Sequence, residues 1–236
     1  MIIGALEKNS FIDFPGRLSA VLFTAGCNFR CPYCHNPEIV DWGSSGRKPV
    51  PLDSVISYLR ERSGFLDGVV ITGGEPCLHG EHLLALCRRI REMGYPLKLD
   101  TNGSRPDVLK SILSENLADY LAMDIKTTPA AYHRVWPGAD GSAIKTSAAM
   151  IMDAGRKSGI CYEFRTTCVR PIIDETAFDL VLDWIDGAAR YVLQGCRPDV
   201  ALDPFFFDNQ QAIVTPAELA AWKKKAEGRV GECCIR

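Results

Sequence analysis

Long hydrophobic runs are missing from this chain of 236 residues. A membrane-spanning helix needs about 18 consecutive apolar residues, whereas apolar stretches such as 69–71 and 148–152 end quickly. Residues 1–14 also lack the basic segment followed by an apolar one that a secretory signal requires. We therefore expect no membrane segment and a location in the cytoplasm.

An excess of positive charge is missing too. The 27 Lys and Arg residues are balanced by 29 Asp and Glu residues, which gives a net charge of −2. This balance provides no global field that would attract nucleic acid, so we expect no nucleic-acid partner. The ten cysteines are too few for a disulfide scaffold. In a reducing compartment, clustered thiols instead indicate metal binding or redox chemistry.

Strand-like and helical patterns alternate along the chain. The apolar runs predict six strands, at 18–25, 66–72, 97–102, 120–126, 161–169 and 191–194. Helical patterns lie between them, at 52–62, 81–93, 106–115, 144–154 and 175–185. A capping box at Thr215 to Glu218, with Pro216 at the first helical position, predicts a last helix. Repeated strand-helix units imply an α/β fold with a parallel sheet and right-handed crossovers.

Polar side chains alternate along one face of the predicted strands. The pattern includes Lys98, Asp100 and Asn102 on one strand, Asp124 and Lys126 on the next, Glu163, Arg165 and Thr167 on another, and Gln194 on the last. A sheet covered by helices on both sides would be apolar on both faces. The polar face therefore favours an incomplete (β/α)6 TIM-like barrel around a polar ligand, with function at the carboxyl ends of the strands. Internal salt bridges are the alternative explanation for individual residues.

A C-x3-C-x2-C motif directly follows the first predicted strand and contains Cys27, Cys31 and Cys34. Three thiolates on one tight loop can each bind a different iron of a cubane cluster, whereas ferredoxin-type sites supply four cysteines. An iron without a protein ligand is an open coordination site, where a metal can act on a substrate. The alternatives are a structural zinc site completed by His35, and an electron carrier completed by Cys77 or Cys196.

A second motif, Thr72-Gly73-Gly74-Glu75-Pro76, ends the second predicted strand. Consecutive glycines let the backbone approach a ligand closely, and a carboxylate such as that of Glu75 accepts hydrogen bonds from an ammonium group. On its own the motif could be a simple turn. Its position after the cysteine loop makes it more specific.

Together the two motifs resemble those of radical S-adenosylmethionine (radical SAM) enzymes, including the aromatic Tyr33 before the third cysteine. The resemblance implies a 4Fe–4S cluster on Cys27, Cys31 and Cys34. Its open iron would bind the amino and carboxylate groups of S-adenosylmethionine, and one electron would cleave this cofactor to methionine and a 5'-deoxyadenosyl radical. The protein would supply ligation, orientation and exclusion of side reactions, with no catalytic residue beyond the cluster and cofactor.

Three further segments, 100–103, 123–126 and 162–165, resemble those of glycyl-radical-enzyme activases such as the pyruvate formate-lyase activating enzyme. By this resemblance Asp100, Thr101 and Asp124 would gather a monovalent cation beside the cofactor carboxylate, and Lys126 and Arg165 would face the cofactor. The implied cofactor-binding set is Tyr33, Gly73, Gly74, Glu75, Asp100, Asn102, Asp124, Lys126 and Arg165.

Over nearly the whole chain, the most extensive resemblance is to activating proteins of anaerobic ribonucleoside-triphosphate reductases, a compact single-cluster group. It carries the segments 10–16, 23–27, 35–38 and 190–194. It implies a single radical SAM domain over residues 1–236, with an N-terminal extension at 1–17, a partial barrel at 18–200 and a C-terminal loop and helix at 201–236. The partners would be a glycyl radical enzyme and an electron donor such as flavodoxin or ferredoxin.

Two other functions remain open at this point. One is a radical SAM enzyme that acts on a small molecule, similar to 7-carboxy-7-deazaguanine synthase. The other is a non-catalytic zinc or electron-transfer module. Cys87 lies on an apolar helix face and is expected in the core, and Cys161 and Cys168 have opposite strand parity, so they do not form a pair directed at one ligand. The role of Cys233 and Cys234 stays open.

Overall fold

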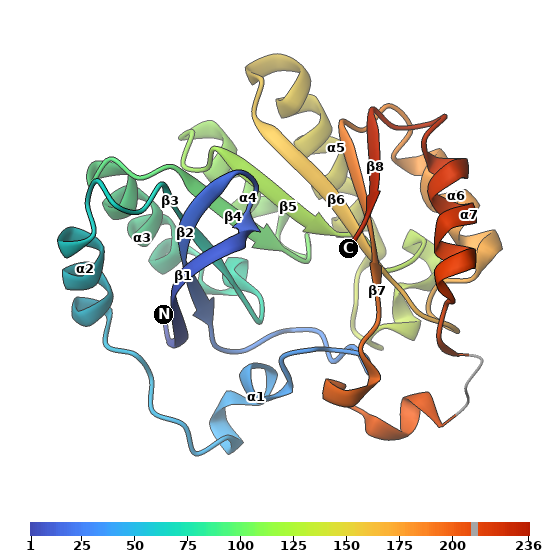
Figure 1. The fold of residues 1–236 in the computed structure, drawn as a ribbon, viewed down its shortest axis with the longest axis horizontal. Coiled ribbons are helices and arrows are strands. Elements are labelled where there is room, and N and C mark those ends of the chain that lie inside the picture. Colours follow the sequence, from blue (N-terminus) through green and yellow to red (C-terminus); the bar gives the residue numbers. More distant parts are fainter. Residues whose placement is uncertain (209–211) are drawn as a thin grey trace. The chain divides into compact units, whose positions relative to one another are not determined.

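The computed structural model describes residues 1–208 and 212–236 (Figure 1). The chain forms two compact units. The first contains residues 1–28, 38–101 and 107–121, and the second contains residues 29–37, 102–106 and 122–236. Among the described residues, no helix combines the length and apolar character that crossing a membrane requires. The predicted C-terminal segment 201–236 includes residues 209–211, which lie outside the described part.

The first unit is built on strands that follow one another in chain order. They are β1 (Ile3–Phe14), β2 (Arg17–Thr24), β3 (Gly68–Gly73), β4 (Leu97–Thr101) and the start of β5 (Tyr120–Asp124). β1 and β2 form an antiparallel hairpin, whereas β2 pairs with β3, and β3 with β4, in parallel. β4 is buried at every position, including its charged residues. The polar side chains of β4 are therefore buried in the interior of the protein.

Three amphipathic helices accompany these strands: α2 (Leu52–Glu61), α3 (Glu81–Glu92) and α4 (Pro106–Ser114). Their buried positions recur at helical spacing, as at Leu83, Leu86, Cys87 and Ile90 of α3. Cys87 is completely buried, which confirms its structural assignment. The apolar faces of the helices provide the driving force for the unit's core.

The second unit contains the end of β5 together with β6 (Cys161–Cys168), β7 (Arg190–Gly195) and β8 (Glu232–Ile235). β6 pairs with β7, and β7 with β8, in parallel. Its helices are α5 (Gly141–Ser158), α6 (Glu175–Trp184) and α7 (Pro216–Ala226). Phe178 of α6 stacks on Trp222 of α7 at 4.6 Å and on Tyr191 of β7 at 6.1 Å between ring centroids. Through these aromatic contacts, α6 packs against β7 and α7 packs against α6.

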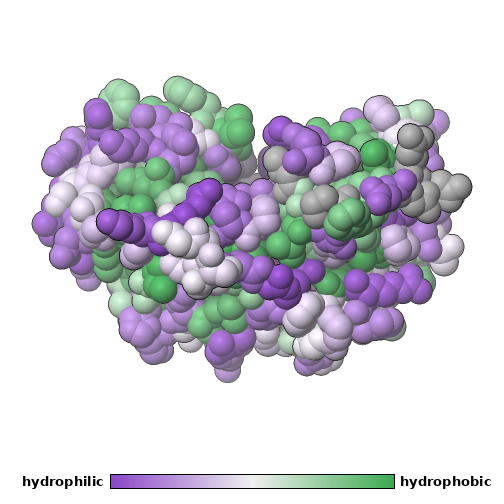
Figure 2. All heavy atoms as spheres, turned by 90° about the horizontal axis from the view of Figure 1, so that it is seen from below, coloured by the Kyte–Doolittle hydropathy of each residue, from purple (hydrophilic) through white to green (hydrophobic). Residues whose placement is uncertain are grey.

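Short elements complete the described chain: α1 (Pro37–Val40), η1 (Trp42–Ser44), η2 (Pro76–His79), η3 (Pro129–Arg134), η4 (Pro198–Val200) and η5 (Pro204–Phe207). Hydrophilic and hydrophobic residues are interspersed over the face that Figure 2 shows.

The predicted α/β class with parallel strand pairing is confirmed, and each of the six expected strands is present within a few residues. The capping box of α7 is confirmed as well, because Thr215 and Glu218 exchange their capping hydrogen bonds. The structure adds β1 and β8, which the sequence analysis treated as an extension and a tail. β1 mixes polar and apolar residues without regular alternation, and β8 has only four residues, so neither carries a strong strand pattern.

Candidate functional site

The cysteine loop follows β2 and begins in the first unit. Cys27 belongs to this unit and is half-buried, whereas Cys31 and Cys34 belong to the second unit. A tight turn joins the latter two, because the Cys34 N–H donates to the Cys31 carbonyl at 3.0 Å. Burial raises the pKa of the Cys31 thiol, and the positive charge of Lys126 works against this rise. A cation beside a buried thiol favours the thiolate, the form that binds metal.

The alternatives for a fourth ligand each meet a competing contact. Cys77 is buried at the start of η2, where its sulfur lies 3.5 Å from the Thr101 hydroxyl oxygen. Nε2 of His35 accepts the backbone N–H of Arg197 at 3.2 Å and lies 3.8 Å from the Cys196 sulfur. Over residues 1–208 and 212–236, no group of three or more His, Cys, Asp or Glu side chains is arranged as a metal site. Cluster ligation by the three cysteines therefore stays a prediction.

Tyr33 lies inside the cysteine loop and is only 3% exposed. Its hydroxyl is buried, and no hydrogen-bond partner reaches it from the part of the chain that the structure describes. Burial also raises the pKa of this phenol well above its usual range, so the O–H is retained. Buried polar groups in folded proteins are nearly always paired. An unpaired hydroxyl inside this loop therefore fits a bound cofactor that supplies the missing acceptor.

The backbone of the glycine motif packs directly against the backbone at the end of β2. Gly73 has a φ of +122°, which L side chains rarely adopt. The Gly74 N–H donates to the Thr24 carbonyl at 2.9 Å, and a Cβ on Gly74 would lie 1.9 Å from the Gly26 carbonyl oxygen. Only glycine fits this approach, which brings the motif to the backbone just before Cys27.

Glu75 is completely buried at the end of this motif. Its N–H donates to the Gly26 carbonyl at 2.9 Å. Its Oε1 accepts hydrogen bonds from the Cys77 N–H at 2.9 Å and from the Thr101 hydroxyl at 2.8 Å. A buried carboxylate must be paired, and these donors orient the group that the sequence analysis assigned to the cofactor's ammonium.

The polar residues of β4 lie in the first unit, and the segment after it begins the second. Asp100 forms an ion pair with Lys98, and its Oδ2 accepts a hydrogen bond from the Thr72 hydroxyl at 3.3 Å. Asn102 is buried, and its side-chain oxygen accepts the Ser104 N–H at 2.9 Å, which shapes the turn after the strand. Asn102 therefore has a local structural role that the sequence analysis did not recognise.

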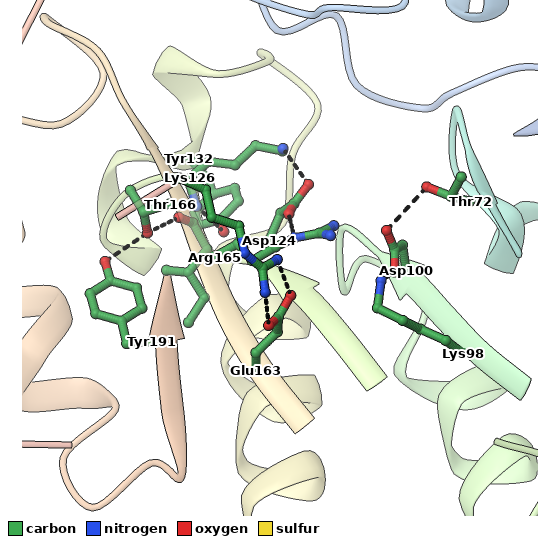
Figure 3. Close-up of polar contacts among 12 residues, drawn as sticks. Thr72, Lys98, Asp100, Asp124, Lys126, Tyr132, Glu163, Arg165, Thr166 and Tyr191 are labelled. Atoms are coloured by element: carbon green, nitrogen blue, oxygen red, sulfur yellow. Dashed lines mark hydrogen bonds and ion pairs between the residues drawn. The ribbon is translucent and has the colours of Figure 1, made fainter. Parts of the chain in front are cut away.

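In the second unit, Asp124 is held between two cations (Figure 3). Its Oδ1 lies 2.9 Å from Nε of Arg165, and its Oδ2 lies 3.3 Å from Nζ of Lys126. Burial alone would raise the pKa of Asp124, but the charges of Arg165 and Lys126 outweigh it and hold the pKa at about 2. Burial alone would lower the pKa of Lys126, but Asp124 and Cys31 outweigh this effect and raise the pKa well above its usual value. Near neutral pH, the side chains of Asp124, Arg165 and Lys126 together carry a net positive charge.

This low pKa leads to a prediction about acid stability. A group whose folded pKa lies below its unfolded value of 3.8 stabilises the fold above that value, and the contribution is lost as the pH falls through about 2. Because the Asp124 side chain is 32% exposed, we expect Asp124→Asn to lower the free energy of unfolding by about 1 to 2 kcal/mol at pH 7. The deficit should shrink between about pH 4 and pH 2.

Urea unfolding of cluster-free protein at several pH values measures this deficit. Asp153→Asn is the control, because Asp153 is a half-exposed residue that forms an ion pair with Lys157 within α5. A deficit that stays constant down to about pH 2 would contradict the assigned pKa.

Several residues of this region were not among the predicted site residues. The Tyr132 hydroxyl accepts the Lys126 N–H at 3.1 Å, and the Thr166 hydroxyl bridges from the Tyr191 hydroxyl to the Ile125 carbonyl. Glu163 is completely buried and paired through both oxygens with Arg236 at 3.1 Å. The period-two alternation of β6 places Glu163 and Arg165 on one face, but only the fold identifies the partner of Glu163.

The amino-acid sequence is similar to those of several known proteins. Residues 21–177 match the family model described as the Radical SAM superfamily. A candidate glycyl-radical enzyme activating enzyme of Methanocaldococcus jannaschii is 33% identical over 206 residues, which is 87% of this chain and 84% of that protein. The pyruvate formate-lyase-activating enzyme of Clostridium pasteurianum is 31% identical over 128 residues, which cover 52% of each chain.

A relative with a different reaction matches less of the chain than the Methanocaldococcus jannaschii protein does, but more than the Clostridium pasteurianum enzyme does. The 7-carboxy-7-deazaguanine synthase of Thermococcus kodakarensis is 28% identical over 172 residues, which is 66% of this chain and 65% of that protein. Among solved structures, a radical SAM methyltransferase from Sphaerobacter thermophilus superposes with a TM-score of 0.68 at 13% identity. It covers 97% of this chain and 68% of that one, and it supports the fold alone.

Proposed function

This chain belongs to the radical SAM superfamily, and we propose that it is an activase that generates a glycyl radical on a partner enzyme. Membership brings the incomplete TIM-like barrel fold of the family and its cofactors, a 4Fe–4S cluster and S-adenosylmethionine. The observation that carries the activase proposal is the match to a glycyl-radical enzyme activating enzyme over 84% of that protein's length.

The chain's own residues fit these cofactors. Cys27, Cys31 and Cys34 would hold the cluster, and their loop also contains the buried Tyr33 hydroxyl. When bound, the cluster supplies the electron for reductive cleavage of S-adenosylmethionine, whose 5'-deoxyadenosyl product abstracts a hydrogen atom. Glu75 would accept hydrogen bonds from the cofactor's ammonium group.

The two cationic side chains of the predicted set would hold the cofactor's carboxylate. Lys126 and Arg165 present positive charge around Asp124, and Lys126 is largely shielded from water. Charge-assisted hydrogen bonds from such cations are about twice as strong as neutral ones. Their role is to bind and orient the cofactor and to exclude water.

For the partner, we propose an anaerobic ribonucleoside-triphosphate reductase, with flavodoxin or ferredoxin as electron donor. Support comes from the resemblance of segments throughout the chain, including 10–16 and 190–194, to activating proteins of such reductases. The similarity to 7-carboxy-7-deazaguanine synthase supports the second candidate, a radical SAM enzyme that acts on a small molecule.

Anaerobic incubation separates these functions. Reconstituted protein, S-adenosylmethionine and a reductant are combined with the reductase, with pyruvate formate-lyase, or with neither. We expect a doublet glycyl radical signal in electron paramagnetic resonance with the reductase, and none with a reductase variant whose radical-bearing glycine is alanine. A doublet with pyruvate formate-lyase alone would overturn the partner assignment. Turnover of a deazapurine precursor without any doublet would overturn the activase assignment.

A further inference from the structure

Lys98 is a buried lysine that the proposed chemistry leaves without a role. It is the second residue of β4, opposite Val70 of β3, and is only 1% exposed. Lysine is almost never fully buried unless it is paired. A lysine in this position therefore requires an interior anion.

Asp100 is that anion, and both of its oxygens are engaged within the first unit (Figure 3). The Lys98 ammonium pairs with Oδ1, and the Thr72 hydroxyl donates to Oδ2 at 3.3 Å. The ammonium also lies 5.9 Å from the ring centroid of Tyr120, whose face attracts a cation. The ion pair is thus set in a closed environment, where the loss of either partner leaves an uncompensated buried charge.

The same contacts bear on the monovalent cation that the sequence analysis placed beside Asp100, Thr101 and Asp124. At Asp100 a fixed ammonium already lies against one carboxylate oxygen. Thr101 directs its hydroxyl to Glu75. In the second unit, each oxygen of Asp124 has its own cation, Arg165 or Lys126. The positive charge that a metal cation would bring to these two carboxylates is therefore already supplied by the protein's own ammonium and guanidinium groups.

We propose that Lys98 is a positioning residue that supplies the positive charge at Asp100 in place of a dissolved monovalent cation. It keeps the carboxylate ionised and oriented, so the chain binds S-adenosylmethionine without Na⁺ or K⁺. The inference rests on the proposed function only in taking Asp100 as part of the cofactor site.

The test measures the affinity of the reconstituted protein for S-adenosylmethionine in potassium, sodium or tetramethylammonium chloride at equal ionic strength. Tetramethylammonium is too large and too weakly coordinating to replace an alkali ion. The wild type should bind within about twofold in all three salts. Lys98→Met should bind at least about tenfold more weakly in tetramethylammonium than in potassium or sodium, because an alkali ion can then neutralise Asp100.

Two further variants keep the test decisive. Lys98→Arg retains the charge and should bind equally in the three salts, and Lys110→Met is the control, because Lys110 is exposed on α4. Should Lys98→Met fail to fold, the salt ratios of the wild type and Lys98→Arg still decide. A wild type that loses about tenfold in tetramethylammonium overturns the inference, as does a folded Lys98→Met that is equally weak in all salts. No partner enzyme is present, so a failure to form a glycyl radical would leave this ratio unchanged.

Discussion

Replacing Cys34 with alanine is expected to abolish radical chemistry in this protein. The cluster would keep two of its three thiolate ligands, and a cubane held by too few cysteines is not retained. We expect the anaerobically reconstituted variant to lose its iron and sulfide, and 5'-deoxyadenosine formation to fall by about 1,000-fold or more. Iron and sulfide analysis and a 5'-deoxyadenosine assay measure the two effects.

Matched cysteine variants show whether the effect is specific to the loop. Cys161→Ala removes an exposed thiol at the start of β6 and should retain cluster and activity. Cys196→Ala and Cys77→Ala address the alternative of a fourth cysteine ligand. We expect both to keep the cluster, although Cys77→Ala also loses the contact with Thr101. A Cys34→Ala protein with full iron and sulfide, or loss of the cluster in Cys196→Ala, would contradict the three-cysteine assignment.

Gly74→Ala is expected to cause the second large loss. Its Cβ would lie 1.9 Å from the Gly26 carbonyl oxygen and 2.5 Å from the carbonyl carbon. Backbone atoms cannot rotate away, so the chain must shift, and overpacking of this kind costs about 1 to 3 kcal/mol. The shift breaks the hydrogen bond from the Glu75 N–H to that carbonyl. The loop that leads to Cys27 and the carboxylate of Glu75 would both move.

We expect Gly74→Ala to weaken S-adenosylmethionine binding by about 100-fold and to lower the melting temperature by about 5 °C. The control is Gly43→Ala, because a Cβ on Gly43 would meet no heavy atom within 4 Å and its φ is not positive. Equilibrium binding to the reconstituted protein and thermal unfolding measure the effects. Wild-type affinity in Gly74→Ala would show that the motif does not contact the cofactor.

The parts of the fold that sequence reasoning predicted are those with a strong local pattern. The helices α2 and α3 show apolar residues at helical spacing, and the parallel strands are short β-branched runs such as 69–71. β1 was missed because its polar and apolar residues do not alternate regularly, and its strand state comes from pairing with β2. β8 was missed because four residues with two cysteines carry no periodicity, and only β7 gives them a partner.

The candidate site divides in a similar way. Alternation along β4 and β6 identified the charged residues that share a face, because side chains two positions apart in a strand always point the same way. Alternation could not say which charge meets which. The pairing of Asp100 with Lys98, two residues away, depends on the rotamers of both side chains. The pairing of Glu163 with Arg236 joins residues that lie far apart in the chain.

By itself the sequence carried the features typical of radical SAM enzymes, which are three closely spaced cysteines and a glycine motif at a strand end, and residues 21–177 match that superfamily. These features are local, since covalent spacing alone limits how far apart the groups can lie. The tertiary structure decided how the charges are balanced, with Lys98 against Asp100, and Arg165 and Lys126 against Asp124. Buried charges interact strongly over a few ångströms, so their energies depend on packing that no spacing specifies.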